Sequence, residues 1–123
     1  MVAKTILLVD DEFLIQMLAR EVLEQAGYMT IAAYDGLQAL TALSTAIDLI
    51  VTDVMMPRMD GPEWVRHARE RGYTEVPVIF ASALAPSSIA DEFGNAAFLR
   101  KPYEPERLLA CVAEMLGEPA HVH

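Results

Sequence analysis

Three aspartates stand where apolar segments of the chain end. Asp10 and Asp11 directly follow the run Thr5–Val9, and Asp53 directly follows the run Asp48–Thr52. Short, largely apolar runs rich in β-branched residues are typical of strands buried on both faces of a parallel sheet. The carboxyl ends of such strands meet at one edge, where ligands bind in open α/β folds, so we expect the three carboxylates to lie together. Crowded carboxylates repel one another, and either some stay protonated or a cation neutralises them.

The donor types at this edge favour a hard cation. Mg²⁺ prefers oxygen ligands, keeps several waters and takes its remaining ligands from a substrate phosphate. These acidic motifs hold no cysteine or histidine, so zinc is not expected.

A lysine and a hydroxyl extend the same chemistry. Lys101, followed by Pro102, comes after the last apolar segment, and the chain has only two lysines against seven arginines. A lysine in such a chain suggests a need for a compact point charge. Ser82 closes the run that begins at Val76 and can offer its hydroxyl at the same edge. Taken singly, Lys101 could be a surface lysine and Ser82 a polar residue at a strand end. Together with the acids they predict a phosphoryl-transfer site, in which one carboxylate can be the nucleophile.

The elements that must position these residues alternate regularly along the chain. The pattern predicts strands at 5–9, 28–32, 48–52, 76–82 and 97–99, and helices at 13–26, 37–43, 63–71, within 83–94 and at 105–116. Five alternations predict a doubly wound five-stranded parallel sheet with helices on both faces, in one domain over residues 1–123. In the first helix, Leu14, Leu18 and Val22 step by four along one face, which we expect to be the apolar face.

Composition narrows the class of protein. A net charge of −9 argues against nucleic-acid binding, and no apolar run approaches the ~20 residues of a membrane span. The single cysteine, Cys111, falls on an apolar helical face and is expected to be a buried structural thiol, which fits a reducing cytoplasm. His121 and His123 are a weak metal signal near the C-terminus, and His67 is expected to be solvated.

The chain carries four motifs, which are Leu8–Glu12, Thr52–Gly61, Phe80–Ala83 and Lys101–Tyr103. Together they resemble the receiver domain of bacterial two-component response regulators, a CheY-like family. They cover nearly the whole chain, in the family's order and with nearly its spacings. The resemblance implies a flavodoxin-like sheet in the order 2-1-3-4-5 with five helices, of which the fourth is short here.

The resemblance also implies a role for each candidate residue. Asp53 would accept a phosphoryl group from the phosphohistidine of a histidine kinase or phosphotransfer protein. Asp11 and Asp53 would bind Mg²⁺ directly with the backbone carbonyl of Met55, while Asp10 would act mainly through water. Ser82 and Lys101 would contact the phosphoryl oxygens. Phe98 occupies the family's aromatic switch position.

The segment between Ser82 and Lys101 departs from the family pattern because it is about one helical turn shorter. Phe80–Ala85 is also a loose variant of a Phe-Ala-Thr-Gly-x-Tyr motif found in one receiver subgroup, without its glycine and tyrosine. We expect residues 83–94 to be the moving part, because only Ile89 and Phe93 offer an apolar stripe to hold so short a helix. A downstream protein partner would then bind the segment 84–94, the fifth strand and the last helix.

Three other functions remain open on the sequence. A Mg²⁺-dependent phosphatase with an aspartyl-phosphate intermediate would place a second acid where Met55 stands. A flavodoxin-like cofactor protein would carry a glycine- and hydroxyl-rich loop after Val9, where acids stand instead. A degenerate receiver would have lost part of the set formed by the three aspartates, Ser82 and Lys101.

Overall fold

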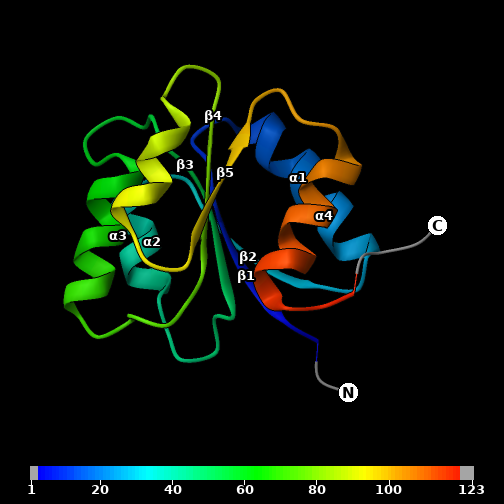
Figure 1. Ribbon diagram of the computed structural model, residues 1–123, viewed down its shortest axis with the longest axis horizontal. Helices are drawn as coiled ribbons and strands as arrows, with labels where there is room; N and C mark the ends of the chain where they lie inside the picture. The colour runs from blue at the N-terminus through cyan, green and yellow to red at the C-terminus, as the bar shows by residue number, and fades with distance from the viewer. Residues whose placement is uncertain (1–2, 120–123) are drawn as a thin grey trace.

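Five parallel strands form the sheet, in the order β2-β1-β3-β4-β5 (Figure 1). The computed structural model describes residues 3–119, so the predictions on His121 and His123 lie outside the described residues. The strands are β1 Thr5–Val9, β2 Met29–Ala33, β3 Leu49–Asp53, β4 Val78–Ser82 and β5 Ala96–Arg100. Their number, direction and order confirm the predicted sheet.

Helices cover both faces of this sheet, as Figure 1 shows. They are α1 Phe13–Gln25, α2 Gly36–Ala42, α3 Gly61–Glu70, the 3₁₀ helix η1 Ser87–Glu92 and α4 Pro105–Leu116. Helices α1 and α4 pack on one face, and α2, α3 and η1 pack on the other. Within residues 3–119, no helix is long and apolar enough to span a bilayer.

Two local features set the start of α3, which begins two residues earlier than predicted. The carboxylate of Asp60 accepts a hydrogen bond from the backbone N–H of Glu63 at 2.8 Å, and Pro62 lies in the first turn. An aspartate cap and a proline at this position are both favourable helix starts. Gly61 must be glycine, because a Cβ there would lie 2.3 Å from the backbone oxygen of Asp53. The N-terminus of α3 is therefore seated directly against the end of β3.

The predicted apolar face of α1 is wrong for Leu14 and Leu18, whereas Val22 packs partly buried against the core as predicted. Leu14 and Leu18 are 61% and 53% exposed, and the buried residues are Gln16, Ala19 and Leu23. Gln16 can take a core position because its side-chain amide donates to two backbone carbonyls there. The leucines therefore turn outward. With the exposed Phe13 and Met17 they form an α1 apolar patch, which consists of Phe13, Leu14, Met17 and Leu18.

The short fourth helix is a 3₁₀ helix of six residues. Ile89 and Phe93 pack partly buried against the sheet, as predicted, and the ring centres of Phe93 and Phe80 lie 5.0 Å apart.

Cys111 on α4 is half-buried rather than fully buried, and burial raises the pKa of its thiol. A protonated thiol packed against the core agrees with the structural role expected for it.

Candidate functional site

The three aspartates do converge at the carboxyl edge of the sheet. Asp53 ends β3, while Asp10 and Asp11 follow β1, and these two strands are neighbours in register, with Val9 opposite Thr52. One carboxylate oxygen from each aspartate lies within 4.8 Å of the other two. Asp10 and Asp53 are buried, and Asp11 is exposed. The site is thus a pair of buried acids with a third acid at its mouth.

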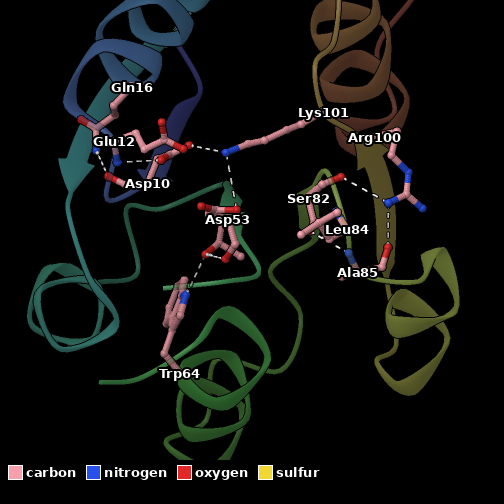
Figure 2. Close-up of polar contacts among 11 residues, drawn as sticks. Asp10, Glu12, Gln16, Asp53, Trp64, Ser82, Leu84, Ala85, Arg100 and Lys101 are labelled. Atoms are coloured by element: carbon pink, nitrogen blue, oxygen red, sulfur yellow. Dashed lines mark hydrogen bonds and ion pairs between the residues drawn. The ribbon is translucent and has the colours of Figure 1, made fainter. Parts of the chain in front are cut away.

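Lys101 reaches both buried carboxylates. Its Nζ lies 2.8 Å from Asp10 Oδ2 and 3.4 Å from Asp53 Oδ1 (Figure 2). Burial alone would lower the pKa of this ammonium, but the hydrogen bond and the charge of Asp10, with the charge of Asp53, raise it above its ordinary value. Lys101 therefore stays charged and supplies a fixed positive charge next to Asp53. Its backbone N–H donates to the carbonyl of Ser82 at 3.0 Å, which fixes its place after β5.

The positive charge near Asp53 is too small to neutralise its carboxylate fully. Burial raises the pKa of its carboxyl to about 6, and Lys101 only partly offsets this, while Asp10 raises it further. An ionised Asp53 is therefore costly without another cation. Three carboxylates in mutual reach, with one exposed to solvent, fit the all-oxygen, partly hydrated coordination that Mg²⁺ prefers. The donor set therefore fits the predicted metal.

The backbone of Asp53 is held by two residues that the sequence analysis missed. The indole N–H of the fully buried Trp64 donates to Thr52 Oγ1 at 2.9 Å, and that hydroxyl donates to the backbone oxygen of Asp53 at 2.9 Å. This chain of bonds runs from α3 to the end of β3 (Figure 2). The sequence offered part of the signal for this contact, because a buried tryptophan needs a hydrogen-bond acceptor for its indole N–H.

Gln16 supports Asp10 in a similar way, and the sequence analysis missed it too. Its Nε2 donates to the carbonyl of Asp10 at 3.2 Å and to that of Ala33 at 2.7 Å. Asp10 Oδ1 accepts from the backbone N–H of Glu12 at 2.9 Å. These bonds connect the loop after β1 to the end of β2 and fix the direction of the Asp10 carboxylate.

Ser82 lies at the end of β4, but its hydroxyl serves the loop that follows. Its Oγ accepts from the backbone N–H groups of Leu84 at 3.2 Å and Ala85 at 3.0 Å. The structure thus brings together Asp10, Asp11, Asp53 and Lys101, and it places the Ser82 hydroxyl toward residues 84–85. Phe98 is half-buried on β5 opposite Phe80, and the predicted metal ligand Met55 lies in the loop between β3 and α3.

The fold and the residues at this edge of the sheet define a class of protein. It is a doubly wound α/β protein in which Asp53, Lys101 and the acids Asp10 and Asp11 have the chemistry that phosphoryl transfer needs. The family comparison makes the assignment specific. Residues 6–113 match the family described as the response regulator receiver domain, and the chain belongs to that family. It is a receiver domain of a two-component phosphorelay, a signalling domain rather than a conventional enzyme.

The chain resembles part of a transcriptional regulatory protein and part of a sensor kinase. The transcriptional regulatory protein CpxR of Escherichia coli K12 is 36% identical over 112 residues, which are 90% of this chain and 48% of CpxR. The sensor kinase CckA of Brucella abortus is 36% identical over 118 residues, which are 91% of this chain and 12% of CckA. The chain thus spans half or less of the length of these relatives.

Solved structures show the same fold. The chemotaxis protein CheY4 of Vibrio cholerae superposes with a TM-score of 0.86 at 31% identity, covering 94% of this chain and all of that one. The receiver domain of the hybrid histidine kinase CckA superposes with a TM-score of 0.79 at 33% identity, covering 91% of this chain and 98% of that one.

Proposed function

We propose that residues 1–123 act as one phospho-acceptor domain in which Asp53 takes a phosphoryl group from the phosphohistidine of a histidine kinase or phosphotransfer protein. The observation that carries this proposal is the position of Asp53, which lies in contact with the Lys101 ammonium and within reach of Asp10 and Asp11. Asp10 is a poorer nucleophile, because Lys101 and the N–H of Glu12 already occupy its oxygens. Asp11 is exposed to solvent at the mouth of the site.

In the proposed reaction, one oxygen of Asp53 attacks the phosphorus atom and the bond from phosphorus to the donor imidazole breaks. The electron pair of that bond returns to the imidazole nitrogen. Lys101 neutralises charge on the phosphoryl oxygens, and the Ser82 hydroxyl donates to one of them after the transfer. Mg²⁺, held by Asp11, Asp53 and the Met55 carbonyl, with Asp10 acting mainly through water, would supply further neutralisation of those oxygens when bound.

The phosphodonor should dock on the α1 apolar patch. Asp53 is 8% exposed and lies at the carboxyl edge of the sheet, the edge at which α1 begins. Beside the patch, a groove of about 700 Å³ runs between α1 and α4, lined largely by apolar side chains, and Lys101 lines it as well. A helix that covers the patch and this groove would bring a histidine on its surface to Asp53. The predicted occupant is therefore an amphipathic helix of the donor.

For the downstream partner we propose the same surface that was predicted from the sequence. Segment 84–94, β5 and α4 adjoin Ser82 and Phe98, and Leu84 at the start of this segment is 83% exposed. Phosphorylation would draw Ser82 inward and change the conformation of this segment. A domain that receives its phosphoryl group from a histidine kinase must lie in the compartment where the kinase binds ATP. We therefore propose that the domain acts in the cytoplasm.

Mass spectrometry tests the proposal directly. The intact protein, incubated with Mg²⁺ and acetyl phosphate, should gain the mass of one phosphoryl group, and Asp53→Asn should gain none. Asp60→Asn is the matched control, because asparagine caps a helix as well as aspartate does and Asp60 lies outside the acid cluster. Modification of Asp53→Asn at the wild-type rate would show that another residue is the acceptor.

A further inference from the structure

Arg100 binds the loop that carries Ser82. It is the last residue of β5 and pairs with Ser82 across the sheet. Its Nη1 donates to the carbonyls of Ala85 at 2.7 Å and Ser82 at 3.4 Å (Figure 2). It also donates to the carbonyl of Ala83 at 3.2 Å. One guanidinium group therefore bonds to the backbone of the loop after β4 at three residues.

The same loop is held from its other side by Ser82 itself. The hydroxyl oxygen of Ser82 accepts from the N–H groups of Leu84 and Ala85. The carbonyls of Ser82, Ala83 and Ala85 thus accept from Arg100, while the N–H groups of Leu84 and Ala85 donate to the Ser82 hydroxyl oxygen. If the Ser82 hydroxyl turns toward Asp53, at least one of its hydrogen bonds from the N–H groups of Leu84 and Ala85 must break. The loop that Arg100 binds then becomes less tightly held.

Arg100 also contacts the switch aromatic. Its guanidinium carbon lies 4.6 Å from the centre of the Phe98 ring, two residues earlier on β5. A cation over an aromatic face is a favourable contact, and hydrogen bonds from a charged donor are stronger than neutral ones. A single side chain is thus in contact with both groups expected to change on phosphorylation.

We propose that Arg100 is a positioning residue that holds loop 82–85, and with it the Ser82 hydroxyl and Phe98, in the conformation of the unphosphorylated protein. This inference rests on the proposed function, because the phosphoryl group on Asp53 is what draws Ser82 away. The contacts of Arg100 stabilise the resting arrangement, and they are lost or changed when Ser82 turns toward Asp53. A side chain that favours only the resting state lowers the apparent affinity for anything that binds the other state.

Beryllofluoride, a mimic of the phosphoryl group, provides the test. It is titrated in saturating Mg²⁺ into the wild type, Arg100→Met, Arg100→Lys and the control Arg71→Met. Arg71 is exposed at the end of α3, and its replacement removes the same charge away from the loop. The fluorescence of Trp64, the single tryptophan, reports binding through its hydrogen bond to Thr52.

We expect Arg100→Met to bind beryllofluoride roughly three- to ten-fold more tightly than the wild type. Arg100→Lys, which keeps a charged donor, should lie closer to the wild type, and Arg71→Met should match it. The amides of Leu84 and Ala85 should also exchange hydrogen faster in free Arg100→Met. A purely structural role would lower stability without tightening binding, so unfolding in urea is measured on the same samples.

The outcomes separate the two proposals. Unchanged or weaker binding by Arg100→Met, with normal binding by the wild type, overturns the role of Arg100 and leaves the function of Asp53 intact. Equal binding by the wild type and Asp53→Asn overturns the proposed function itself. If Arg100→Met does not fold, Phe98→Leu, which removes one contact of Arg100, should still tighten binding to a smaller extent.

Discussion

Replacing Asp53 with asparagine should stabilise the metal-free protein at neutral pH, although it removes an ion pair with Lys101. Burial raises the pKa of the Asp53 carboxyl from 3.8 to about 6, so its charged form is disfavoured in the folded chain despite the nearby ammonium. Asparagine has the shape of the protonated acid and never carries that charge. The variant therefore avoids a cost that the wild type bears whenever Asp53 is ionised.

The size and sign of the effect follow from the pKa. Because the folded state holds the proton more tightly than the unfolded state, the stability that Asp53 contributes is fully present below pH 3.8. It is lost as the pH rises through about 6. A pKa difference of this size corresponds to about 3 kcal/mol above pH 6. Asp53→Asn should thus gain up to ~3 kcal/mol at about pH 7.5, or roughly 10 °C in Tm, and almost nothing near pH 4.

Urea unfolding in the presence of a chelator, followed by Trp64 fluorescence, measures this difference at both pH values. Asp60→Asn is the control and should show no comparable pH dependence. Addition of Mg²⁺ should then stabilise the wild type selectively, because the variant has lost a ligand. The reasoning is refuted if Asp53→Asn is the less stable protein at about pH 7.5, or if its gain is the same at both pH values.

Three further predictions concern the chemistry of the site. Chelation of Mg²⁺ should stop phosphorylation by acetyl phosphate, and equal phosphorylation with and without metal would contradict this. In a fluorescence titration, Asp11→Ala should weaken metal binding more than Asp10→Ala does. The phosphorylated protein should lose its phosphate slowly, because the apolar side chain of Met55 cannot orient a water, and phosphate release that is unaffected by Met55→Asn or Met55→Glu would remove this argument. Thr52→Val should cost about 1–3 kcal/mol in urea unfolding, because it leaves the buried Trp64 N–H without its acceptor, whereas Thr52→Ser should stay near the wild type.

The local pattern of the chain was enough to predict much of the fold. The bounds of β1 and α4 agree with those expected, and other elements differ by only a few residues at their ends. These elements are predictable because buried parallel strands and amphipathic helices leave strong periodic signals over short windows. The strand predicted at 48–52 stops one residue short of the end of β3, because a strand that ends in a charged residue looks in sequence like a strand that stops before it. The structure includes Asp53 in the strand.

The sequence by itself determined that Asp10, Asp53 and Lys101 meet. Each comes at the end of a strand, and all strands of a parallel sheet end at the same edge, so order along the chain fixes proximity in space. The resemblance of four motifs to receiver domains led to the same site and to the order of the strands. Neither conclusion depended on the packing of any particular side chain.

Tertiary structure alone decided where several side chains point. Gln16 rather than Leu14 or Leu18 is buried, because two backbone carbonyls at the strand ends supply acceptors that no helical periodicity reveals. The hydrogen bonds of Arg100 to the loop after β4 depend on the pairing of β4 with β5, which brings Arg100 opposite Ser82. A hydrogen bond needs its partner at the right distance and angle, and residues far apart in the chain acquire that geometry only when the whole fold is in place.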